Sequence, residues 1–181
     1  MPLAGVGFFA DTQDYLIFST MSADQTIRIL VVGCGNMGAS HAKAYEAHHA
    51  FEICGLVSRG SSKKTLNDAL KGDYPLFDDY ESALRQIKPD AVCISTYPET
   101  HEPYTLAALE MGCHVFLEKP IATTVAGGLR ISEKAKSLNK KVVVGYILRH
   151  HLVWKRFIEE AQKLGKPLVM RMNLNQQSQE I

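Results

Sequence analysis

The chain has 181 residues, a length that accommodates one complete domain and part of a second. Hydrophobic residues account for 46% of it and charged residues for 22%, which is ordinary for a globular protein and argues against disorder. The 20 Lys and Arg residues nearly balance the 19 Asp and Glu residues, and the formal charge of +1 argues against a general nucleic-acid-binding protein. No apolar run approaches the roughly 20 residues that a membrane-spanning helix needs, so we expect no membrane association.

The cysteine pattern fits neither a disulfide framework nor a zinc site. No Cys-x-x-Cys pair occurs, and most of the cysteines lie in apolar, strand-like runs, where a reduced thiol behaves as a small hydrophobe. They are Cys34, Cys54, Cys93 and Cys113. The seven histidines also lack metal-ligand spacing. We therefore expect no metal, a reducing compartment and a cytoplasmic location.

The first 24 residues contain no Lys or Arg, so they match neither a secretory signal nor a transit peptide. We treat residues 1–24 as an extension, in which residues 15–18 could form a short strand or remain unstructured. Met21 opens a polar lead into the first regular strand and resembles a natural start. Residues 1–20 are accordingly expected to be dispensable for folding.

Short apolar segments then alternate with helical ones, which is typical of a parallel sheet covered on both faces. Strands are expected at residues 27–32, 51–57, 74–77, 90–95, 114–117 and 141–144. Helices are expected at residues 36–50, 61–70, 78–87, 102–111 and 124–138. Asp78 and Glu81 resemble a capping box at the third of these helices. The predicted fold class is α/β, with a doubly wound parallel sheet of the Rossmann type over residues 25–148.

The pattern changes after this domain. Residues 150–164 carry apolar side chains at helical spacing, and residues 168–175 alternate apolar and polar as in a strand with one buried face. Such a strand would be the first of an antiparallel sheet, so residues 149–181 are interpreted as the start of a truncated α+β domain. Alternatively, the strand pairs with another chain, either a second copy or a different partner.

A G-x-G-x-x-G motif follows the first expected strand and opens the first expected helix, which is the context that a dinucleotide-binding loop requires. Gly33 permits the tight turn, Gly35 lets the backbone approach a pyrophosphate, and Gly38 lets the helix pack on the strand. Asn36 and Met37 complete the motif, where the helix N-terminus favours a bound anion. A plain glycine turn is the less favoured interpretation.

The residues after the second strand indicate which dinucleotide is bound. An NAD site would place Asp or Glu about twenty residues beyond the glycines, to bind the ribose hydroxyls, whereas this chain has Ser58 and Arg59 there. A guanidinium group suits a 2′-phosphate, and Ser58 can donate a hydrogen bond to the same phosphate. Lys63 and Lys64 would make the electrostatic potential there more positive. The sequence therefore favours NADP, with NAD as the alternative if Arg59 is only a solvated surface residue.

Two further segments carry a resemblance to a known family. Residues 93–101 read Cys-Ile-Ser-Thr-Tyr-Pro-Glu-Thr-His, and residues 114–122 read His-Val-Phe-Leu-Glu-Lys-Pro-Ile-Ala. With the glycine motif and residues 144–146, they resemble the Gfo/Idh/MocA oxidoreductase family, of the glucose-fructose oxidoreductase and inositol dehydrogenase type. The resemblance extends over residues 26–175. The family commonly has Thr-Pro after the fourth strand, whereas Tyr97 intervenes here before the proline.

The resemblance implies an oxidoreductase that transfers a hydride between a nicotinamide and a hydroxyl-bearing carbon of a sugar or polyol. Lys119 would be the catalytic residue, facing both the nicotinamide and the substrate hydroxyl, with Glu118 close enough to tune it. This placement agrees with the binding of ligands beyond the carboxyl ends of parallel strands. The remaining cofactor contacts that the resemblance implies are Ser95, Thr96, Tyr97, His101, Pro120 and Arg149.

Several alternatives stay open at this stage. A packing role at the start of a helix suits His101 about as well as a cofactor contact, and His41 is expected to pack on the sheet. The chain could also be a non-catalytic dinucleotide-binding module that docks a partner through residues 168–175, or a poorly folding remnant. The substrate itself is not predicted, because the family's substrate contacts would lie mostly in the second domain.

Overall fold

The computed structural model describes residues 26–167, 169 and 171. The chain divides into two compact units, Met1–Gly145 and Tyr146–Ile181, which are described separately. The expected strand at 168–175 lies outside the described residues except for residues 169 and 171. Residues 1–24 lie outside them entirely, so the structure carries no information on the extension.

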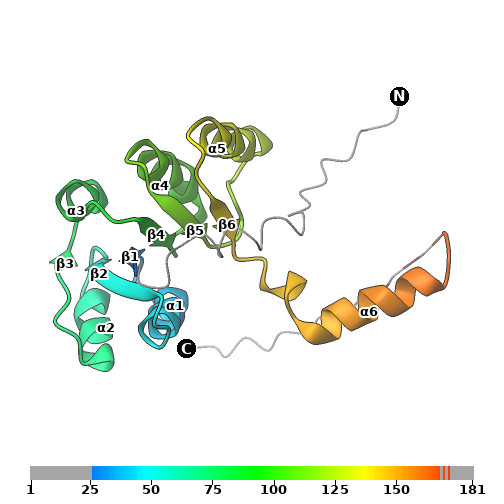
Figure 1. Cartoon of the computed structure of the whole chain (residues 1–181), viewed down its shortest axis with the longest axis horizontal. Coiled ribbons are helices and arrows are strands. Elements are labelled where there is room, and N and C mark those ends of the chain that lie inside the picture. Colours follow the sequence, from blue (N-terminus) through cyan, green and yellow to red (C-terminus); the bar gives the residue numbers. More distant parts are fainter. Residues whose placement is uncertain (1–25, 168, 170, 172–181) are drawn as a thin grey trace. The chain divides into compact units, whose positions relative to one another are not determined.

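A six-stranded parallel sheet forms the centre of the first unit, in the order β3-β2-β1-β4-β5-β6 (Figure 1). The strands are β1 (Ile27–Val32), β2 (Phe51–Val57), β3 (Leu76–Phe77), β4 (Ala91–Ile94), β5 (His114–Leu117) and β6 (Val142–Val144). The chain winds in one direction from β1 to β3 and in the other from β4 to β6. The expected doubly wound α/β sheet is thus confirmed, and its switch point lies between β1 and β4.

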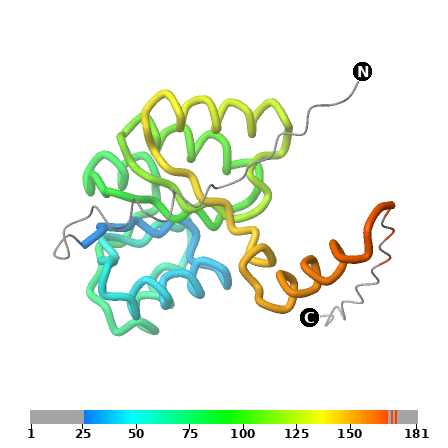
Figure 2. Tube along the Cα trace, turned by 45° about the vertical axis from the view of Figure 1, so that its right-hand side comes forward, coloured from blue at the N-terminus to red at the C-terminus, as the bar shows by residue number. Residues whose placement is uncertain are grey.

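Helices cover both faces of this sheet, as Figures 1 and 2 show. One face packs against α1 (Asn36–Glu46) and α2 (Ser62–Leu70). The other face packs against α3 (Tyr80–Ile87), α4 (Pro98–Glu110) and α5 (Val125–Ser137). Leu30 belongs to one hydrophobic core and Val31 to the other, because successive residues of a strand point to opposite faces. Strand positions buried on both sides must be apolar, which explains the apolar runs at residues 29–32 and 53–57, whereas Arg28 and Glu52 lie at less buried positions near the strand starts.

Helix boundaries differ from the expected ones where capping decides them. The side chain of Asp79 accepts a hydrogen bond from the backbone N–H of Ser82 at 2.7 Å, so Asp79 is the N-cap of α3. The capping box predicted for Asp78 and Glu81 is therefore wrong, since the N-cap lies one residue later and the third residue after it is Ser82. α4 begins at Pro98 rather than at residue 102, because proline is well suited to the first turn, where a backbone N–H has no helical acceptor.

All four cysteines are free and buried. Burial raises the pKa of each thiol to about 11, so the neutral thiol predominates at pH 7. They act as small core residues, in agreement with the expected absence of disulfides among them.

The second unit contains a 3₁₀ turn, Ile147–Arg149, and α6, Leu152–Lys163, which matches the helix expected over 150–164. Along α6, Arg156 pairs with Glu160 at 2.6 Å. No helix in the described ranges is long and apolar enough to cross a membrane.

Candidate functional site

A pocket of about 560 Å³ lies where the sheet order reverses. Its walls come from the segments that follow β1, β2 and β4 and from the beginnings of α3 and α4. The lining includes Gly33, Cys34, Gly35, Ser58, Arg59, Gly60, Ser62, Asp78, Asp79, Tyr80, Ser95, Thr96, Tyr97, Thr100 and Tyr104. Ligands of open α/β sheets bind at this switch point, beyond the carboxyl ends of the strands.

The glycine loop shows two different kinds of requirement for glycine. Gly33 has a positive φ of 91°, and a Cβ on it would overlap the carbonyl of Ser95. A Cβ on Gly38 would overlap the carbonyl oxygen of Gly33, so α1 can start directly after β1 only with glycine here. A Cβ on Gly35 would meet nothing within 4 Å, because this residue faces open space.

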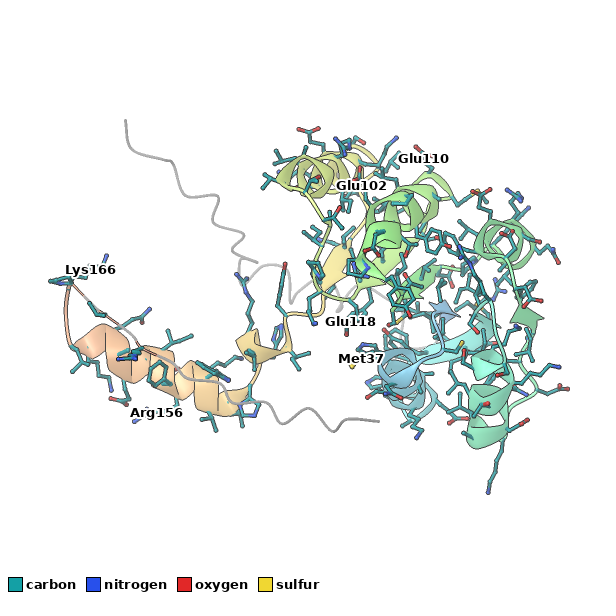
Figure 3. The ribbon with its side chains drawn as sticks, turned by 180° about the vertical axis from the view of Figure 1, so that it is seen from behind. Met37, Glu102, Glu110, Glu118, Arg156 and Lys166 are labelled. Atoms are coloured by element: carbon teal, nitrogen blue, oxygen red, sulfur yellow. The ribbon has the colours of Figure 1, made fainter. Side chains whose placement is uncertain are left out.

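The first turn of α1 is open to a ligand. Asn36 and Met37 are exposed, and Figure 3 labels Met37 at this end of the helix. No side chain caps this N-terminus, and its first turn contains no acidic residue. The backbone N–H groups of this turn therefore lack helical acceptors and favour an anion.

The loop after β2 places Arg59 in the lining of the pocket. The Lys63 side chain fixes the backbone of this loop by hydrogen bonds. The Lys63 ammonium donates to the backbone carbonyls of Ser58 and Gly60, both at 2.8 Å, and to Asp78 Oδ1 at 2.5 Å. Arg59 is exposed and forms no ion pair with any described residue. The positive electrostatic potential expected from the Lys63 ammonium is therefore largely cancelled by the Asp78 carboxylate. Arg59 remains the prominent cation at this edge of the pocket.

The loops after β4 and β5 are joined through a buried histidine. His101 is fully buried on α4, and its ring nitrogens lie 2.6 Å from the carbonyl oxygen of Pro120 and 3.2 Å from that of Thr96. It therefore supports both loops from inside the protein, as in the packing alternative. Tyr97, by contrast, is 82% exposed and lines the pocket.

Glu118 is the buried acidic residue at the end of β5 (Figure 3). Its Oε1 lies 2.7 Å from His41 Nε2, and its Oε2 accepts the backbone N–H of Lys119 at 3.2 Å. The His41 ring also packs on Phe116 with 4.7 Å between ring centroids. His41 thus packs on the sheet as expected, and it also holds Glu118, a contact that the sequence did not predict.

The pocket brings together about half of the predicted cofactor residues. Those that line it are Gly33, Gly35, Ser58, Arg59, Ser95, Thr96 and Tyr97. Asn36, Met37 and Gly38 lie in the first turn of α1, and Glu118, Lys119 and Pro120 follow β5 without lining the pocket. Arg149 belongs to the second unit. No group of three or more His, Cys, Asp or Glu residues that could hold a metal occurs in the described part of the chain.

Sequence reasoning missed several lining residues, among them Asp78, Asp79, Tyr80 and Tyr104. A signal for the first three was available, because they follow β3, whose carboxyl end lies at the same edge of the sheet as those of β1 and β2. Tyr104 had no such signal, since it lies in the second turn of a helix. Its ring packs against that of Tyr80 with 4.4 Å between centroids.

Comparison with known proteins identifies the family. Residues 27–146 match an oxidoreductase family described as having an NAD-binding Rossmann fold. The chain belongs to the Gfo/Idh/MocA family. Among curated relatives, inositol 2-dehydrogenase of Paracoccus denitrificans is 31% identical over 160 residues, which are 80% of this chain and 44% of that protein. D-glucoside 3-dehydrogenase of Escherichia coli is 31% identical over 140 residues, 76% of this chain and 38% of that one.

Solved structures agree with this Gfo/Idh/MocA assignment. An NAD-binding protein from Listeria innocua superposes with a TM-score of 0.60 at 30% identity, over 67% of this chain and 35% of that one. Scyllo-inositol dehydrogenase from Lactobacillus casei, with NAD(H) and scyllo-inositol bound, has a TM-score of 0.69 at 24% identity, which shows the shared fold. It covers 78% of this chain and 42% of that one. The chain thus spans less than half the length of these relatives.

Alanine substitutions at Gly38 and Gly35 should differ strongly in their effect on stability. Gly38→Ala places a methyl group against the Gly33 carbonyl and should lower the free energy of unfolding by about 1–3 kcal/mol. Gly35→Ala meets no protein atom and has an ordinary φ of −76°, so its effect should stay within about 0.5 kcal/mol. Urea unfolding measures both, and equal losses would contradict this account of the loop.

The His41–Glu118 contact should be energetically coupled. In a double-mutant cycle with His41→Phe and Glu118→Gln, we expect a coupling free energy of about 0.5–3 kcal/mol, because both groups are largely shielded from water. The exposed pair Arg85–Glu81 on α3 is the matched control, with an expected coupling of about 0.3–0.5 kcal/mol. A coupling no larger than the control would refute the interaction.

Proposed function

We propose that this chain binds a nicotinamide dinucleotide, with NADP preferred over NAD, as the cofactor-binding part of an oxidoreductase. The observation that carries the proposal is the glycine loop. It combines open space at Gly35 with an uncapped helix N-terminus at the switch point of the sheet. When bound, the dinucleotide supplies a nicotinamide ring that accepts or donates a hydride.

The preference for NADP is supported by the charges around the loop after β2. Ser58 and Arg59 stand where an NAD site would have a carboxylate, and Arg59 forms no ion pair among the described residues. The two carboxylates that line this edge are already engaged. Asp78 pairs with Lys63, and Asp79 caps α3. A 2′-phosphate would therefore meet a guanidinium whose charge is not shared with a neighbouring acid.

Lys119 is the proposed catalytic residue for a sugar or polyol substrate. It is exposed directly after β5, and its ammonium forms no ion pair among the described residues, while Glu118 accepts from its backbone N–H. Its side chain would hydrogen-bond the reacting oxygen of the substrate and hold or move a proton there. The names of the relatives, which include inositol and glucoside dehydrogenases, support this substrate class.

The buried, reduced thiols support a cytoplasmic location.

Calorimetric titration with NADPH and with NADH tests the cofactor. NADPH should bind more tightly, and Arg59→Ala should weaken NADPH by about 10- to 100-fold while leaving NADH nearly unchanged. That loss corresponds to about 1.5–3 kcal/mol for hydrogen bonds to a charged group. Arg85→Ala, an exposed arginine on α3 outside the pocket, is the matched control and should change neither affinity.

Two further variants separate the parts of the proposal. Gly35→Ala, which the fold tolerates, should weaken both dinucleotides alike, because its methyl group would occupy the space needed by the pyrophosphate. Lys119→Ala should leave binding intact and abolish turnover of polyols. Equal affinity for NADH and NADPH would refute the NADP preference alone, whereas a folded chain that binds neither would refute the whole proposal.

A further inference from the structure

Lys63 is the one lysine among the described residues that is buried. It lies in the first turn of α2 with 7% of its surface exposed, whereas its neighbour Lys64 is exposed. Its ammonium has three N–H donors, and the structure gives it three acceptors, the carbonyls of Ser58 and Gly60 and the carboxylate of Asp78. No donor is left over for a ligand.

This position does not help the helix itself. A cation in the first turn opposes the helix dipole, and α2 has neither an acidic residue in that turn nor a side-chain N-cap. Burying an ammonium is also costly unless hydrogen bonds and an opposite charge compensate for the lost water. All the compensating contacts of Lys63 lie outside its own helix, so its placement serves the loop after β2 and the segment after β3.

The two carbonyls that Lys63 holds flank Arg59 directly. The same loop is fixed at its start by the Ser58 backbone N–H, which donates to the Phe77 carbonyl at 3.1 Å. The hydroxyls of Ser58 and Ser62 lie 2.8 Å apart, which closes the loop on the first turn of α2. Arg59 is therefore presented from a short segment whose backbone is tied on both sides.

The charges around the Lys63 ammonium also matter for an anionic ligand. Asp78 and Asp79 line the pocket together with Arg59, and the Cys34 thiol close by has its pKa raised to about 11 by burial, so it is neutral. Lys63 offsets the charge of Asp78, and Asp79 accepts a backbone N–H at the start of α3. Without Lys63, the Asp78 carboxylate would repel a phosphate bound at Arg59.

We propose that Lys63 is a positioning residue for cofactor selection. It holds residues 58–60 in the geometry in which Arg59 meets a 2′-phosphate, and it neutralises Asp78 beside that phosphate. The inference rests on the proposed NADP preference of the same pocket. It differs from direct phosphate binding, because every donor of Lys63 is already used within the protein.

The test is the ratio of NADPH to NADH affinity, measured by calorimetry on the whole chain. Lys63→Met should lower this ratio by about three- to tenfold, since a loosened loop must be ordered again when the phosphate binds. Lys136→Met removes an exposed lysine on α5 that does not line the pocket and should leave the ratio unchanged. A purely structural role would weaken both cofactors equally and leave the ratio as it is, which would overturn the proposal.

Two further variants separate positioning from a simple field effect. In an Arg59→Ala background, Lys63→Met should lower the ratio less than it does in the unmodified chain, because only the repulsion from Asp78 remains; an equal loss in both backgrounds would overturn the positioning role. Lys63→Gln, which is neutral but still donates hydrogen bonds, should retain an intermediate ratio, whereas a field effect predicts that Gln and Met behave alike. If the methionine variant does not fold, the glutamine variant carries the comparison.

Hydrogen exchange of the free protein tests the loop without any cofactor. Lys63→Met should speed amide exchange in residues 58–62 and leave β4 and β5 unchanged, and unchanged exchange in the loop would overturn the positioning role. If the unmodified chain binds neither dinucleotide, the proposed function fails and the selection role fails with it. The exchange experiment still decides separately whether Lys63 holds the loop.

Discussion

The close approach of the glycine loop to the ends of β1 and β4 is the constraint on which the rest of the site depends. Gly38 lets α1 begin against the carbonyl of Gly33, and Gly33 lets the chain turn against the carbonyl of Ser95. These contacts set an uncapped helix N-terminus at the point where the sheet reverses its order. Any larger side chain at either position would push the helix away from the strands, and the anion-binding end would no longer face the pocket.

A second common feature is that buried polar groups tie each surrounding loop to the scaffold. Lys63 holds the loop after β2, His101 joins the loops after β4 and β5, and Glu118 connects the Lys119 backbone to His41 on α1. Each of these groups is buried and hydrogen-bonded, because an unpaired polar group in the interior would be costly. Of the exposed residues with proposed chemistry, Lys119 directly follows Glu118, and Arg59 lies between the two residues whose carbonyls Lys63 binds. Exposed, charged side chains are thus carried on backbone segments that buried hydrogen bonds hold in place.

The sequence alone was sufficient for most of the fold. Short apolar runs and their alternation with helical segments predicted all six strands and the doubly wound sheet, because strand positions buried on both faces require apolar residues. It was less reliable at helix ends. The N-cap of α3 is Asp79 rather than Asp78, and both residues have the same side chain, so only the backbone geometry distinguishes them.

For the candidate site, local spacing in the sequence predicted the glycine loop and the pair Ser58 and Arg59, which the structure brings to the same pocket. Tertiary structure alone decided what Lys63, His41 and His101 do. Their partners Asp78, Glu118 and Pro120 are separated from them in the chain and come close only because the carboxyl ends of the parallel strands lie at one edge of the sheet. A charged or imidazole side chain has the same sequence signature on a surface and in a buried hydrogen-bonded position, and burial is a property of the assembled sheet and helices.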